Sequence, residues 1–139
     1  MINNFRGKYF FLSNFYMAPV IWDGSHFTNN EAAFQSAKLT SRIKRNELFS
    51  EADPRTAKRL GRKVQLRPDW EEVKYDIMYE IVKAKFTQNE DLKEKLLATG
   101  DEYLEEGNNW GDKVWGTVNG EGENNLGKIL MRVREELRQ

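Results

Sequence analysis

Three polar residues, Glu31, Gln35 and Lys38, recur at the i, i+4, i+7 spacing that places side chains on one face of a helix. A carboxylate, an amide and an amine on one face are groups that can transfer protons, bind hydroxyls or attack an electrophilic carbon. The same spacing also suits a solvated helix face held by weak side-chain contacts. The spacing therefore marks a candidate site, with a solvated face as the alternative.

A second candidate site is the loop of residues 106–116, in which Trp110 and Trp115 flank Asp112. An apolar wall beside Asp112 would favour its protonated form and suit it to acid–base work. An aromatic plate beside a carboxylate would also suit the binding of a planar base. The alternative is structural, because glycine-rich loops commonly serve turn geometry and buried tryptophans commonly serve the core.

Three further signals are weaker. Residues 122–127 form a glycine-containing turn before the last expected helix, where backbone N–H groups would suit a phosphate, although a simple N-cap by Asn124 or Asn125 explains the pattern as well. His26 has no partner visible in the sequence, which favours a structural strand-end role. A cluster of basic residues is expected to be mostly a solvated helix face, with its end after Gly61 able to meet a phosphate. The cluster comprises Arg55, Lys58, Arg59, Arg62, Lys63 and Arg67.

The first half of the chain predicts a hairpin followed by helices. Residues 8–16 begin like a strand and reach a turn at Ser13-Asn14, and residues 20–27 form a hairpin because Asp23-Gly24 suits a primed turn. Asn29 or Asn30 is expected to cap a helix from Glu31 that carries Phe34, Ala37 and Ile43 on its apolar side. Capping signals predict two further helices, from Pro54 to Gly61 and, after a capping-box variant at Asp69, to about Phe86.

The second half predicts two more helices separated by the candidate loop. One begins after Asn89 and stops at Thr99-Gly100, and the other carries its apolar stripe from Leu126 to Leu137. Residues 103–106 are expected to form a short strand. Five helices with a few short strands predict an α+β fold dominated by helix.

Composition limits the function classes. The 139 residues suit one domain, and the 22 basic and 22 acidic residues cancel, which disfavours a globally basic nucleic-acid coat. The absence of cysteine excludes a disulfide framework, a thiolate zinc site and a cysteine nucleophile, and the single histidine excludes a multi-histidine metal site. No stretch suits a membrane span, and the first residues are too polar for a signal peptide, so a soluble cytoplasmic domain is expected.

Taken together, these stretches resemble the YbiA-like family, also called NADAR domains. The matching segments occur in the family's order and cover nearly the whole chain. They are Phe11–Tyr16, Glu31–Lys38, Asp53–Arg62, Trp70–Phe86, Leu96–Gly100, Asp112–Gly116 and Gly122–Arg134. One position departs from the pattern, because the family usually has histidine where this chain has Ala32.

The resemblance implies a single compact α+β domain over residues 1–139 that acts as an N-glycosidase on the ribose C1′–N bond of a ribosylated base. The implied substrates are a ribosylamino-pyrimidine phosphate of riboflavin synthesis or ADP-ribosyl-guanine in nucleic acid. No cofactor, metal or membrane partner is implied, and a monomer is expected. The rival classes are a non-catalytic module that binds ADP-ribose or NAD and a purely structural helical module.

The resemblance also assigns roles to residues. Glu31 would stabilise the charge at C1′ or activate water, Asp112 would be its acid–base or hydroxyl-binding partner, and Lys38 is a rival nucleophile if burial lowers its pKa. We expect Gln35 to line the same site. The other predicted substrate-binding residues are Trp110, Trp115 and Phe15 for stacking, Gly116 at the wall, Ser13, Asn14 and Asn124 for hydrogen bonding, and Arg6 and Lys8 for phosphate.

Overall fold

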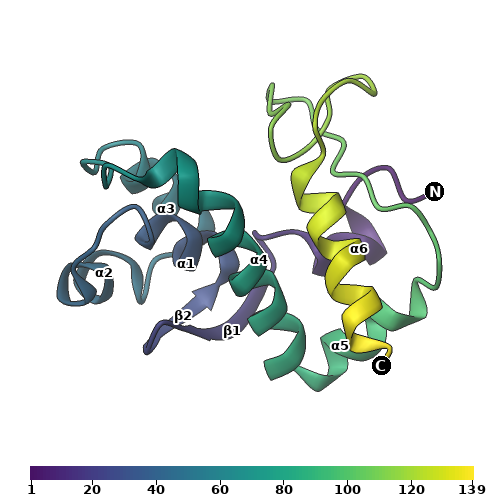
Figure 1. The fold of residues 1–139 in the computed structure, drawn as a ribbon, viewed down its shortest axis with the longest axis horizontal. Helices are drawn as coiled ribbons and strands as arrows, with labels where there is room; N and C mark the ends of the chain where they lie inside the picture. Colours follow the sequence, from purple (N-terminus) through teal and green to yellow (C-terminus); the bar gives the residue numbers. More distant parts are fainter. The chain divides into compact units, whose positions relative to one another are not determined.

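The computed structural model describes residues 1–139 and has an α+β fold with six α-helices, one 3-10 helix and one two-stranded sheet. The chain divides into two compact units, one formed by residues 14–89 and the other by residues 1–13 together with 90–139. Figure 1 shows their elements along the chain. No helix is both long enough and apolar enough to cross a membrane.

The unit of residues 14–89 begins with the predicted hairpin. Strand β1 (Met17–Trp22) pairs antiparallel with β2 (Ser25–Asn29), and Val20 lies opposite Phe27. The turn residues Asp23 and Gly24 have φ values of 48° and 78°, as a primed turn requires. Alternate side chains of β1 are buried, so one face of the hairpin contributes to the core.

Helix α1 (Asn30–Ser36) is shorter than the sequence pattern predicts. Its hydrogen bonds tighten at its end, where the amides of Ala37, Lys38 and Leu39 each donate to the carbonyl three residues earlier. Lys38 therefore lies in the turn after the helix. Ile43 belongs instead to α2 (Arg42–Phe49), is 71% exposed, and does not extend the apolar face of α1.

A separate N-cap explains why α1 and α2 are two helices. The Ser41 hydroxyl accepts a hydrogen bond from the amide of Lys44, which starts α2. The single helix expected from Glu31 to Ile43 is therefore wrong, because it is divided at this cap.

Helices α3 (Pro54–Gly61) and α4 (Trp70–Gln88) follow the predicted boundaries closely. Asp53 caps α3 by accepting from the Thr56 amide, as expected. Asp69 occupies the N-cap position of α4 as predicted, but its side chain does not cap the helix, because Arg67 donates to both carboxylate oxygens, at 2.7 and 3.2 Å. Trp70 is buried against Phe34, with 5.1 Å between ring centres, and belongs to the core of this unit.

The other unit contains the 3-10 helix η1 (Gly7–Leu12) and helices α5 (Glu90–Ala98) and α6 (Asn125–Leu137). The expected strand near residues 8–16 is therefore wrong: Gly7 has a φ of 57° and the Tyr9 amide bonds the Arg6 carbonyl, which starts a helical turn. Residues 103–106 contribute only an isolated bridge, between Leu104 and Ile2, because no further ladder forms beside it. Gly100, at φ 63°, follows α5 as predicted.

Candidate active site

The first turn of α1 holds a buried carboxylate in a fixed place. The Asn29 side chain caps the helix by accepting from the Ala32 amide at 2.8 Å, and the Glu31 amide donates to the Asn14 carbonyl at 3.0 Å. Glu31 is only 9% exposed, and Gln35 Nε2 donates to its Oε1 at 2.9 Å. The two residues thus share a buried hydrogen bond across one helical turn, and this favours the predicted site over a solvated face.

Lys38 lies at the end of the same segment. Its Nζ donates to the Gly61 carbonyl, at the carboxyl end of α3, at 3.0 Å. Burial lowers the pKa of Lys38 below the usual 10.5, and Arg62 and Lys74 lower it further, whereas the Glu31 charge raises it. The net direction is downward, which is the condition set for an amine nucleophile.

Gly61 allows α3 to approach α1 closely. A Cβ atom on Gly61 would overlap the Gln35 side-chain oxygen. The backbone of Gly61 therefore fixes the site twice, by packing against Gln35 and by accepting from Lys38. The sequence marked Gly61 only as the end of a helix.

Two buried asparagines lie beside Glu31. Asn30 Nδ2 donates to Asn14 Oδ1 at 3.3 Å, and Asn14 Nδ2 contacts the Met78 sulfur at 3.4 Å. Asn30 is 1% exposed and its side-chain oxygen has no hydrogen-bond partner. The sequence pattern predicts Asn30 only as a possible helix cap. Its position directly before Glu31 in the chain is the signal that could have placed it beside the site.

The second candidate site is held largely by its own side chains. Asp112 Oδ1 accepts from the amides of Val114 and Trp115 at 3.0 and 2.9 Å. Asn108 Oδ1 accepts from the Asp112 amide at 3.1 Å, and Asn108 Nδ2 donates to the Asp112 carbonyl at 2.9 Å. The Asn108 side chain therefore stabilises the conformation of this loop. The sequence pattern did not predict this role.

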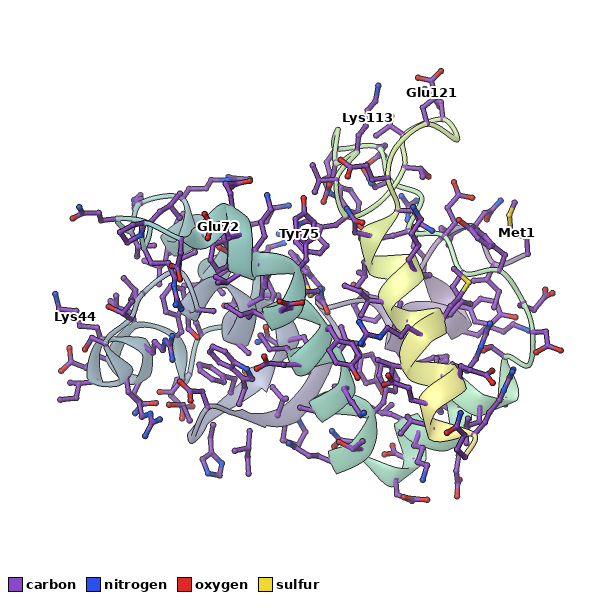
Figure 2. All side chains as sticks on the ribbon, in the orientation of Figure 1. Met1, Lys44, Glu72, Tyr75, Lys113 and Glu121 are labelled. Carbon is purple, nitrogen blue, oxygen red and sulfur yellow. The ribbon has the colours of Figure 1, made fainter.

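The other residues predicted in this loop differ in their surroundings. Trp110 is 55% exposed, whereas Trp115 is half-buried. Gly116 is packed so closely that a Cβ atom would overlap the Glu106 carbonyl. Asn124 is committed to the backbone, since its Oδ1 accepts from the Glu106 amide at 3.0 Å and its Nδ2 donates to the Leu104 carbonyl at 2.9 Å. At the tip of the segment, Lys113 and Glu121 lie 3.8 Å apart (Figure 2).

The residues predicted near the N-terminus lie around η1 and β1. Arg6 and Lys8 are exposed, and the Lys8 amine lies 5.0 Å from the Tyr9 ring centre. Ser13 follows η1, while the half-buried Phe15 ring lies 5.9 Å from the Lys58 amine. His26 is exposed on β2. The structure thus brings Glu31, Gln35 and Lys38 together, and the placement of Asp112 opposite Glu31 stays a prediction.

The buried Glu31–Gln35 pair beside Lys38 is a candidate active site in this α+β chain, and comparison with known proteins identifies the family. The NADAR domain pattern matches residues 3–138. The chain belongs to the NADAR domain family.

Two curated relatives cover most of this chain. N-glycosidase YbiA of Escherichia coli (strain K12) is 38% identical over 128 residues, which are 90% of this chain and 79% of that protein. Riboflavin biosynthesis protein VVA0006 of Vibrio vulnificus (strain YJ016) is 38% identical over 132 residues, which are 93% of this chain and 36% of that protein. The chain therefore spans about a third of the Vibrio protein.

A solved structure shares the fold. The NMR structure of the E. coli protein YbiA matches with a TM-score of 0.86 and 36% identity, covering 99% of this chain and 85% of that one. The α+β fold expected from the sequence is thus confirmed.

Proposed function

We propose that this chain is an N-glycosidase that hydrolyses the C1′–N bond between a ribose and a base. The observation that carries the proposal is the buried Glu31 carboxylate, held by Gln35 within electrostatic reach of Lys38. The relatives named N-glycosidase support the reaction class. The segment from Glu31 to Lys38 lies within residues 3–138, which the NADAR domain pattern matches.

The chemistry requires negative charge near C1′. As the C1′–N bond breaks, positive charge develops on the ribose, the leaving nitrogen takes up a proton, and water adds to C1′. A carboxylate in a buried site stabilises that charge more strongly than it would in water. Glu31 is our first choice for this role or for removing the proton from water, with Asp112 as the proposed partner.

Lys38 offers a rival route. Its neutral amine would attack C1′, the base would leave with a proton, and the opened sugar would remain as a Schiff base until water released it. The charge on Glu31 opposes this route by raising the pKa of Lys38, but burial lowers that pKa by more. We still place Glu31 first, because its role requires no covalent intermediate.

We propose a small phosphorylated ribosylamino-pyrimidine as substrate ahead of ADP-ribosyl-guanine in nucleic acid. The formal net charge of zero supports the small molecule, since strand binding usually needs a basic surface. The name of the Vibrio relative points the same way. A cytoplasmic place of action stays a prediction.

The proposal is tested by a mass-spectrometric turnover screen with ribosylamino-pyrimidine phosphate, ADP-ribosyl-guanosine and NAD. Release of a free base and a sugar product supports it. Binding of ADP-ribose by calorimetry without release of any base over hours would reject it in favour of a binding module.

The two routes are separated by adding borohydride during turnover. A protein–sugar adduct that disappears in Lys38→Ala supports the lysine route. The control is Lys44→Met, which removes an exposed lysine on α2 that does not act on Lys38 in the site. Turnover without any trapped adduct, together with a folded but inactive Glu31→Gln variant, supports the carboxylate route.

A further inference from the structure

The turn that carries Lys38 is held through the backbone carbonyls of residues 37–39, which follow α1. A carbonyl that lies outside a helix needs a donor from elsewhere. The Leu39 carbonyl accepts from Arg45 Nε at 2.9 Å, and the Lys38 carbonyl accepts from the Arg67 amide at 3.0 Å. The Ala37 carbonyl has a longer contact, 3.5 Å, with the Arg67 guanidinium.

Arg45 is itself fixed on several sides. It is 4% exposed, its Nη1 donates to Asp23 Oδ2 at 2.6 Å, and its guanidinium lies 4.8 Å from the Trp22 ring centre. A planar guanidinium can hold a carboxylate, a carbonyl and an aromatic ring at the same time, which lysine cannot do. The hairpin turn is thereby connected, through one buried side chain, to the residue that follows Lys38.

Resting on the function proposed above, we propose that Arg45 is a positioning residue: by holding the Leu39 carbonyl it fixes the 37–39 turn and keeps the Lys38 amine at the carboxyl end of α3. The Arg45 side chain reaches this turn through the Leu39 carbonyl, so its effect on Lys38 passes through the backbone.

The environment of Lys38 shows what would change without this hold. The amine bonds the Gly61 carbonyl, and the charged groups that act on it are Glu31 from α1, Arg62 after α3 and Lys74 from α4. Burial is the main cause of its lowered pKa. If the turn loosens, the amine gains water and its pKa moves back toward 10.5.

The test is the pH dependence of amine labelling, which needs no substrate. Trace acetic anhydride is added over a range of pH, and the labelling of Lys38 is compared by mass spectrometry with that of Lys44. Lys44 is exposed on α2 and points to solvent (Figure 2), so it serves as an internal reference. The neutral fraction of an amine falls about tenfold for a one-unit rise in its pKa.

Arg45→Met keeps the apolar length of the side chain and leaves Asp23 paired with Arg42. We expect the midpoint of Lys38 labelling to rise and its labelling at pH 7, relative to Lys44, to fall about threefold to tenfold. The matched control is Arg42→Met, which removes the other arginine on Asp23 without touching the turn, and should leave the midpoint unchanged. An unchanged midpoint in folded Arg45→Met, whatever its melting temperature, would overturn the proposal.

Asp23→Asn covers the case in which Arg45→Met does not fold. Asparagine tolerates the positive φ of this turn residue, so the variant removes the charge that holds Arg45 and keeps the hairpin. We expect a smaller shift of the Lys38 midpoint in the same direction, and no shift would overturn the proposal. If the midpoint shifts but the protein releases no base from any substrate, the positioning role of Arg45 is supported and the N-glycosidase function is rejected.

Discussion

The α1 segment and the loop of residues 106–116 contain similar polar side chains but use them differently. In the α1 segment, Gln35 bonds the carboxylate of Glu31, and Lys38 reaches a carbonyl of α3. In the loop, the side chains of Asn108 and Asp112 bond backbone atoms no more than four residues away. The first arrangement places ionisable groups together, whereas the second shapes a turn.

Under the function proposed above, the two regions would have different roles. A side chain that saturates nearby backbone groups fixes a loop conformation at little cost. A charge held in a buried place by another side chain acts more strongly on its neighbours than the same charge would in water. We therefore expect the α1 segment to supply the charged groups. We expect the loop to hold the Trp115 ring and the Asp112 carboxylate in fixed orientations.

The largest effect is expected for Glu31→Gln. The amide keeps the shape and can still accept from Gln35, but it loses the negative charge, so turnover should fall about 10²–10⁴-fold. Steady-state kinetics would measure the loss, and Glu72→Gln, which changes an exposed carboxylate on α4 (Figure 2), is the control. Retained turnover in folded Glu31→Gln would show that the reaction does not need the charge of the α1 segment, and would contradict the distinction drawn between the two regions.

Lys85 tests whether a lowered pKa by itself marks a site. It is 1% exposed, its amine lies 5.4 Å from the Tyr16 ring centre, and burial lowers its pKa to about 7. Between pH 7 and 10.5 the unfolded chain binds the proton and the folded chain does not, so stability should rise with pH across that range. Below pH 7 the cost of burying the charge is fully present.

Urea unfolding at pH 7 and pH 10 would measure this dependence. The difference in unfolding free energy due to Lys85 should be on the order of 3–5 kcal/mol, and Lys85→Met should remove it. Lys95→Met, a lysine on α5, is the control. If Lys85→Met leaves the pH dependence of stability as it was, burial is not what sets the pKa of this lysine.

Asp112 can be separated into its structural and chemical parts. Asp112→Asn retains an oxygen that can accept from the Val114 and Trp115 amides, whereas Asp112→Ala loses it. If the carboxylate is the partner of Glu31, Asp112→Asn should lower turnover about 10²-fold with the melting temperature unchanged. Asp112→Ala should lower both. Full turnover in Asp112→Asn would show that Asp112 only stabilises the loop and takes no part in the reaction.

The sequence predicted features that depend on neighbours along the chain. The hairpin turn at Asp23-Gly24, the Asn29 and Asp53 caps and the end of α5 at Gly100 are all set by local backbone chemistry, and all are confirmed. The expected strand near residues 8–16 failed because aromatic density resembled a strand while Gly7 began a 3-10 helix.

Features that depend on distant partners were missed. Asp69 has the residue type of a cap, but Arg67 occupies its carboxylate. Gly61 looked like a helix end, and nothing local shows that Gln35 packs on it. The i, i+4, i+7 spacing still brought Glu31 and Gln35 together, although the helix ended before Lys38, because the following turn continues in the same direction.

The smallest expected effect concerns how the loop binds a base. Trp115 is half-buried and follows Asp112, whereas Trp110 is 55% exposed. If a base stacks on Trp115, Trp115→Ala should weaken ligand binding by about 1–3 kcal/mol. Trp110→Ala should cost less, because a more exposed indole loses more conformational freedom when a base orders it. Calorimetry with ADP-ribose in a Glu31→Gln background would separate affinity from turnover. Equal affinity in folded Trp115→Ala would show that the loop holds this indole for packing and not for the base, and the loop's share in the reaction would then reduce to Asp112.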